Sequence, residues 1–458
     1  KEQEKAEPVI IGELEEERTY TEKHFLRSDG SVVASVFPSN VHYEKDGKFL
    51  DVDNTLEEVI DTEEKLKITE ENTKIEMMQN NQIEEKLNKA IIEEQKKETK
   101  IYKNKTGNAQ IYFTNKTNGY RLGSMESEGY TIKWGLVNSQ SSKVNVNNKN
   151  LEKREVKGLR AKEVKTQIPT TSIEYNEILS NISIEYSAEP EHVKENIILQ
   201  NKESINNELK FVYDVGTLEM KLLETKDIIV YDKTEENVKF TIEAPFMYID
   251  IKLEKQADKY IITLIPDKKW LEAAERIYPI TIDPSIITSR YYDDIKDTFI
   301  YSSQGSDPKG NAHIIRAGNN SGVPTRSLVK FNLPELKAGD QVIGAYLNIF
   351  TYPKTSEWTP NTRQIQLDAH KITADWNENT ATWSNTNANY NSRAEDFILY
   401  QFDYNNQCKQ YTFNITTAAK EWYTTGNNYG VMIKEHLEAN NVSGNDAYFI
   451  SSDMKEDQ

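Results

Sequence analysis

The segment from Arg326 to Tyr352 constrains the fold of this chain more than any other stretch. Polar and apolar residues alternate over Ser327–Phe331 and again over Ala345–Tyr352, and residues 332–340 form a connection punctuated by proline and glycine. Alternation with a period of two predicts β-strands. Because apolar residues occupy much of both faces, we expect these strands in the middle of a sandwich, with further strands around them from about Asp294 onward.

The composition limits the classes of partner. The chain has 458 residues, enough for several domains, and its 25 tyrosines favour β-structure. A formal net charge of -18 opposes binding to phosphate backbones and anionic membranes, so we expect no nucleic-acid partner. No apolar run is long enough to span a bilayer. The single cysteine, Cys408, excludes an internal disulfide.

Changes in pattern divide the chain into four predicted regions. Residues 1–60 contain short β-like runs separated by turns and are predicted to form β-hairpins. Residues 61–105 are dense in charged and amide residues, which predicts either a charged helix that binds a partner or a solvated, partly disordered insert. Residues 106–287 are β-rich with one short helix, which Asp267 is placed to cap. Residues 288–458 have the strand spacing of an antiparallel β-sandwich or jelly roll, so the predicted fold class is mainly β.

Catalytic motifs are missing from the sequence. The six histidines are scattered without an HxxxH or HExxH pattern, and there is no GxSxG, GxGxxG or Walker A motif. Carboxylates are abundant, but with 74 aspartates and glutamates their pairing is expected by chance. We therefore predict that the chain is not an enzyme. A polysaccharide lyase or hydrolase component is the weaker alternative.

Acidic residues at the two ends of the last region suggest a cation site. Asp293, Asp294 and Asp297 cluster where the region begins, and Asp453 lies near its end. Jelly rolls bring their first and last strands together, and Ca²⁺ prefers several carboxylate and carbonyl oxygens. A structural Ca²⁺ site at these four residues is one interpretation, and a solvated acidic rim is the other. No further cofactor is predicted.

Exposed aromatic residues in polar loops are candidates for sugar binding. The candidates are Trp358, Trp376 and Tyr390, whose surroundings are rich in Asn, Thr and Gln. Aromatic faces stack on the C–H surfaces of sugars, while amides satisfy the hydroxyl groups. We expect Trp358 to be the most exposed of them, whereas Trp383 and Trp422 follow the hydrophobic pattern and are expected in the core.

Several short motifs occur in order along the last region: Asp297–Ile300, Ser327–Pro334, Ala345–Leu347, Thr373–Trp376, Ala381–Trp383, Phe413–Thr416 with Trp422, Asn428–Gly430 and Phe449–Ser452. Together they resemble the DNRLRE domain of secreted bacterial proteins. The resemblance implies a β-jelly roll that also occurs as a carbohydrate-binding module beside polysaccharide-degrading enzymes. Members usually finish with one more strand, so we expect this domain to lack its last strand and the chain to be a fragment of a longer protein.

Motifs in the earlier regions are Arg18–Thr19, His42–Tyr43, Asp51–Leu56, Val193–Glu195 and Tyr278–Pro284. They are similar to the region that precedes this domain in wall-associated YD-repeat (Rhs-type) proteins of Gram-positive bacteria. The resemblance implies a secreted, non-catalytic cell-surface segment, N-terminal to a larger cage-forming or toxin-bearing polypeptide. The implied partners are a cell-wall or extracellular polysaccharide and the downstream repeat region. The alternative is a structural plug or scaffold that packs against the repeat shell without binding sugar.

Overall fold

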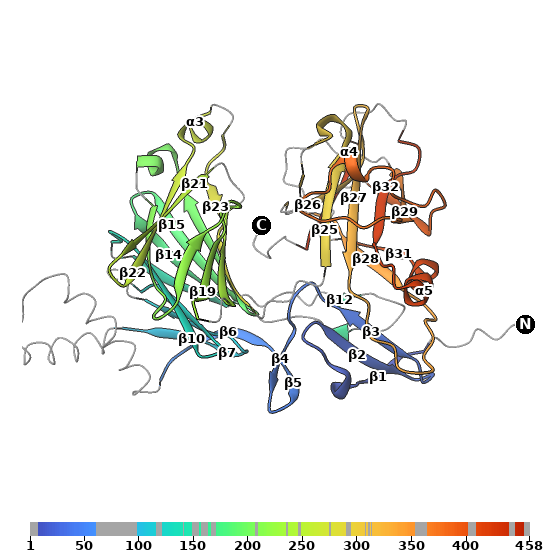
Figure 1. Cartoon of the computed structure of the whole chain (residues 1–458), viewed down its shortest axis with the longest axis horizontal. Helices are drawn as coiled ribbons and strands as arrows, with labels where there is room; N and C mark the ends of the chain where they lie inside the picture. Colours follow the sequence, from blue (N-terminus) through green and yellow to red (C-terminus); the bar gives the residue numbers. More distant parts are fainter. Residues whose placement is uncertain are drawn as a thin grey trace, which may run out of the picture. The chain divides into compact units, whose positions relative to one another are not determined.

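The computed structural model describes residues 8–60, 99–115, 121–140, 142–148, 155–156, 164–165, 171–206, 209–234, 237–245, 249–273, 276–289, 295–306, 308–309, 312, 314–352, 364–401, 409–438 and 445–452. The chain forms two compact units (Figure 1). The first unit combines Lys1–Pro38, Glu155–Thr166 and Asp293–Gln458, and the second combines Ser39–Arg154 and Gln167–Tyr292. Neither unit coincides with a single predicted region, because each is assembled from segments that are distant in the sequence.

The second unit is a sandwich of two antiparallel sheets. The eight-stranded sheet has the order β21 (Ile249–Gln256), β22 (Lys259–Pro266), β17 (Leu209–Asp214), β10 (Tyr130–Leu136), β9 (Gly123–Ser127), β8 (Gln110–Thr114), β7 (Ile101–Thr106) and β6 (Asp53–Glu58). The nine-stranded sheet has the order β11 (Lys143–Asn148), β14 (Thr171–Leu179), β15 (Ile182–Glu189), β16 (His192–Leu199), β24 (Ser285–Thr288), β20 (Asn237–Glu243), β19 (Ile228–Asp232) and β18 (Glu219–Leu222), with β23 (Ile280–Ile282) also paired to β16. The unit also contains the hairpin β4 (His42–Lys45) and β5 (Lys48–Asp51), and helix α3 (Lys268–Leu271). Residues 61–98 of the predicted charged insert lie outside the described residues, and its last five residues belong to β7.

Aromatic residues from both sheets meet in the core of the second unit. The ring centroid of Tyr186 on β15 lies 5.8 Å from that of Trp134 on β10 and 5.6 Å from that of Phe113 on β8. Tyr186 lies opposite Glu195 of β16, and its hydroxyl donates a hydrogen bond to the Glu195 carboxyl group. Complete burial raises the pKa of Glu195 to about 8. A carboxylic acid that is protonated at neutral pH therefore lies inside this core.

The first unit contains the C-terminal sandwich. Its seven-stranded sheet has the order β30 (Asp396–Gln401), β29 (Gln364–Lys371), β32 (Val431–Glu435), β27 (Val323–Phe331), β26 (Ile314–Asn320) and β33 (Asp446–Ile450), with β25 (Ile295–Tyr301) also paired to β27. The smaller sheets are β28 (Tyr346–Phe350) with β31 (Gln410–Asn414), β1 (Ile10–Glu13) with β2 (Glu22–Arg27) and β3 (Val32–Val36), and β12 (Glu155–Val156) with β13 (Val164–Lys165). The helices are α4 (Trp383–Thr386) and α5 (Thr416–Thr425). The predicted fold class, mainly β with a C-terminal antiparallel sandwich, is confirmed.

The two strands predicted from residues 326–352 belong to different sheets. Strand β27 pairs with β25, β26 and β32, whereas β28 pairs with β31. The middle of β27 is buried on both faces. Val329 joins the core that contains Trp422, and Leu328 on the opposite face joins a smaller cluster that contains Trp376. We call the face of the seven-stranded sheet that carries Arg326, Leu328 and Lys330 the outer face.

Residues 372–390, which include α4, cover part of the outer face. Arg326 holds this segment, because its Nε and Nη2 atoms each donate to the Glu438 carboxylate at 2.7 Å, and Nη1 donates to the Asn387 carbonyl. The guanidinium carbon lies 4.6 Å from the ring centroid of Trp383 and 5.2 Å from that of Tyr390. We call these five residues the Arg326 cluster. Trp383 was expected in the core, and it packs half-buried at the edge of the smaller cluster.

Candidate functional site

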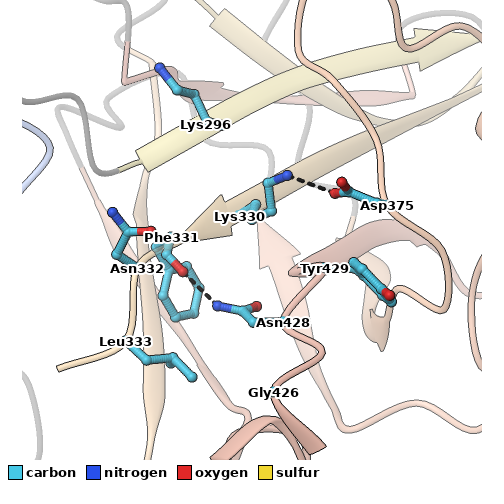
Figure 2. Close-up of a pocket in the computed structure, with 9 residues that line it drawn as sticks. All are labelled: Lys296, Lys330, Phe331, Asn332, Leu333, Asp375, Gly426, Asn428 and Tyr429. Carbon is cyan, nitrogen blue, oxygen red and sulfur yellow. Dashed lines mark hydrogen bonds and ion pairs between the residues drawn. The ribbon is translucent and has the colours of Figure 1, made fainter. Parts of the chain in front are cut away.

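A pocket of about 570 Å³ lies at the C-terminal end of β27. Its lining consists of Lys296, Lys330, Phe331, Asn332, Leu333, Asp375, Gly426, Asn428 and Tyr429 (Figure 2). These residues come from β25, the end of β27 and the loops after β29 and α5. Pairing of β27 with β25 and β32 therefore brings together residues that lie more than 100 positions apart.

The turn at residues 428–430 is fixed to the end of β27. The Asn428 side chain donates to the Phe331 carbonyl at 2.6 Å and accepts from the Gly430 amide at 3.0 Å. Gly430 has a φ of 81°, and a Cβ atom there would lie 2.1 Å from the Val329 carbonyl oxygen. Only glycine fits such an approach, so this position holds Asn428 and Tyr429 at the pocket.

An ion pair crosses the pocket wall. Lys330 donates to the Asp375 carboxylate at 2.9 Å and to the Trp376 carbonyl at 3.1 Å, as Figure 2 shows for Asp375. This hydrogen bond from Lys330 lowers the pKa of Asp375, so its carboxylate is ionised at neutral pH and only accepts hydrogen bonds. The pocket thus combines a carboxylate, two amide side chains, two ammonium groups and the ring of Tyr429.

Of the three residues predicted to bind a glycan, Trp358, Trp376 and Tyr390, the two that the structure describes do not line this pocket. Trp376 is 7% exposed, and its indole N–H donates to the Tyr429 carbonyl at 2.8 Å, so it supports the pocket from behind. Tyr390 packs edge-on against His370 at a centroid distance of 5.0 Å, within the Arg326 cluster. Trp358 lies outside the described residues. A direct contact between these three residues and a glycan stays a prediction.

The sequence interpretation did not assign Lys330, Asp375 or Tyr429 to a binding site. Two features of the sequence could have pointed to these residues. Asp375 lies in the Thr373–Trp376 motif, and Tyr429 lies in the Asn428–Gly430 motif. Both motifs were noted only for their resemblance to a family. Neither predicts that the two loops meet, because that depends on how the strands pair.

The predicted calcium ligands are described only in part. Asp297 is buried on β25, and its carboxylate oxygens accept from the Ser451 hydroxyl and the Ser452 amide, each at 2.6 Å. Asp293, Asp294 and Asp453 lie outside the described residues. Within the described ranges, no group of three or more His, Cys, Asp or Glu side chains is arranged to hold a metal ion. The calcium site stays a prediction.

Comparison with protein families identifies the class of the C-terminal part. Residues 288–458 match carbohydrate-binding module family 96. The last 171 residues, which include the sandwich and the pocket, are therefore a carbohydrate-binding-module-like segment. Among the helices that the structure describes, none is sufficiently long and apolar to cross a membrane.

Curated relatives are similar to a larger share of the chain. The tRNA(Glu)-specific nuclease WapA of Bacillus subtilis subsp. natto is 24% identical over 300 residues, and the tRNA nuclease WapA of Bacillus subtilis (strain 168) is 25% identical over the same length. Each match covers 59% of this chain and 12% of the relative. The chain therefore spans only a small part of the length of the relatives it matches.

Proposed function

We propose that the C-terminal sandwich binds a cell-wall or extracellular polysaccharide through the pocket beside Asp375, and that the chain catalyses no reaction. The observation that carries this proposal is the chemistry of the pocket within a segment that matches a carbohydrate-binding family. The Asp375 carboxylate and the amides of Asn332 and Asn428 suit sugar hydroxyl groups, and the Tyr429 ring suits a C–H face.

We also infer that this is a secreted, wall-associated segment of a Gram-positive bacterium, ahead of a larger YD-repeat (Rhs-type) polypeptide. The order of the motifs and the length of the relatives support this inference. The nuclease activity in the relatives' names then belongs to regions outside the part that matches. An alternative role is a scaffold that packs against the downstream repeat region, which predicts co-purification with that region and no glycan affinity.

Asp375→Ala tests the pocket. A charged hydrogen bond contributes about 1.5–3 kcal/mol, so we expect glycan affinity to fall by about tenfold or more. The measurement is affinity electrophoresis and calorimetry of the full chain with purified Gram-positive wall polysaccharides, after a glycan array has identified those it binds.

The matched control is Asp258→Ala. Asp258 is an exposed carboxylate of the second unit that pairs with Lys259 at 3.2 Å, much as Asp375 pairs with Lys330. We expect this variant to bind like the wild type. Retention of the wild-type chain by none of the glycans, or equal affinity of Asp375→Ala and wild type, would contradict the proposal.

We expect the chain to bind tRNA negligibly at physiological salt and to leave it uncleaved. The reason is the net charge of -18, which repels a phosphate backbone. Gel retardation and a cleavage assay with total bacterial tRNA measure both properties. Cleavage that disappears when one carboxylate is replaced would show that the segment itself is a nuclease.

A further inference from the structure

An exposed apolar pair lies on the outer face, at the end away from the pocket. Phe397 and Leu399 of β30 are 55% and 53% exposed, while Ile398 and Tyr400 between and beside them are buried in the core. Alternate residues of a strand share one face of the sheet. Phe397 lies opposite Asp368 and Leu399 lies opposite Gln366 of β29, so all four side chains are on this face.

A buried carboxylate orients an exposed histidine beside this pair. Asp368, whose side chain is 6% exposed, accepts from Gln366 at 2.8 Å through one oxygen and from Nδ1 of His436 at 2.6 Å through the other. The His436 side chain is 50% exposed. Because a carboxylate oxygen accepts hydrogen bonds, Nδ1 of His436 donates to Asp368, and Nε2 is the ring nitrogen left for a hydrogen bond to a ligand.

The strand pairing separates these residues from the pocket. Val431 of β32 lies opposite Val329 of β27 near the pocket, whereas Glu435 at the other end of β32 lies opposite Leu367 of β29 beside His436. Phe397, Leu399, Gln366 and His436 therefore form a separate surface, which we call the β30 strip.

We propose that the β30 strip is a second contact for the same polysaccharide, with Phe397 and Leu399 against the C–H face of a sugar ring and His436 Nε2 in a hydrogen bond with a sugar hydroxyl group. This inference rests on the proposed function. Asp368 is a positioning residue that sets the tautomer of His436.

The dimensions and composition of the strip favour a sugar over a protein partner. Neighbouring strands are about 4.8 Å apart, so the apolar row on β30 and the polar groups on β29 lie within the width of one sugar ring. Two apolar side chains are too few for a stable protein interface, which buries on the order of 800 Å² from each partner. A pyranose has this combination of one apolar face and a polar edge.

The test uses the full chain with purified wall polysaccharide and with short oligosaccharides cleaved from it. For the double variant Phe397→Ala with Leu399→Ser, we expect affinity for the polymer to fall about fivefold to tenfold, while affinity for the short oligosaccharide at the pocket is unchanged. Asp375→Ala is expected to lose affinity for both. Ile11→Ser, which changes an exposed apolar residue of β1, is the control.

The outcomes separate the two proposals. If the wild-type chain binds neither probe, the proposed function fails. If it binds and the double variant binds the polymer equally well, only the second contact fails. A concentration-dependent dimer in sedimentation that the double variant abolishes would instead assign the strip to a second copy of the chain and overturn the inference.

The positioning role of Asp368 has its own readout. For Asp368→Asn we expect affinity for the polymer to fall as far as it does in His436→Ala. Nitrogen NMR should show proton occupancy of His436 moving from Nδ1 toward Nε2 in Asp368→Asn, and no such change in the Phe397 and Leu399 variant. An unchanged tautomer would overturn this role.

Discussion

Replacing Arg326 with alanine is expected to lower the free energy of unfolding of the first unit by about 3 kcal/mol, because the largely buried Glu438 carboxylate loses its bidentate partner and keeps only Lys434, whose Nζ lies 3.6 Å away. The segment over the outer face also loses the cation between Trp383 and Tyr390. Since the chain has two units, the measurement is hydrogen exchange of peptides from β27 and residues 382–390, together with denaturation followed by fluorescence.

Arg276→Ala is the control for an arginine that stacks on a tryptophan ring in the second unit. In the second unit the guanidinium carbon of Arg276 lies 3.8 Å from the ring centroid of Trp270, and its Nε donates to the Trp270 carbonyl. We expect this variant to lose about 1 kcal/mol. A loss equally small in Arg326→Ala would mean that the Arg326 cluster does not hold the covering segment.

Glu195→Gln is expected to change how the stability of the second unit depends on pH. The pKa of Glu195 is about 8 in the folded chain and near the ordinary value of 4.5 in the unfolded chain. The contribution of Glu195 to the free energy of unfolding is therefore fully present below its unfolded-state pKa of 4.5. This contribution is lost as the pH rises to about 8. At about 1.4 kcal/mol for each pH unit, the loss is on the order of 4 kcal/mol.

Glutamine does not titrate, and its side-chain oxygen still accepts from the Tyr186 hydroxyl. The Gln variant should therefore gain stability relative to wild type between about pH 5 and about pH 8. Urea denaturation of the full chain at both pH values measures the difference. Glu185→Gln, a half-buried neighbour on β15, is the control and should follow the wild type. If the free energy of unfolding changes with pH in the same way in Glu195→Gln and in the wild type, this account is contradicted.

Local features of this fold were predictable from the sequence. The turns at Asp29-Gly30 and Asp46-Gly47 connect β2 to β3 and β4 to β5 as expected, because glycine adopts the positive φ angles that these hairpins require. Asp267 caps α3 by accepting from the Trp270 amide, as predicted. These features depend only on residues close together in the sequence.

The pairing of distant strands was not predictable in the same way. Alternation shows which residues of β28 face the core, such as Leu347 and Ile349, but it does not show which strand lies alongside. The partner of β28 is β31, about 60 residues later, and not β27. The pocket depends on such pairing, since Lys330, Asp375 and Tyr429 meet only after β27, β29 and β32 have assembled. This is why a site was predicted from aromatic composition while its polar residues were missed.

The discontinuous first unit has a consequence for biogenesis. During translation the ribosome completes all of the second unit before most of the first has been synthesised, so the larger sandwich is free to fold early. Strands β1, β2 and β3 must wait for sequence that emerges more than 250 residues later. Contacts of such long sequence separation slow folding, and the waiting β-strands are a target for chaperones and for aggregation.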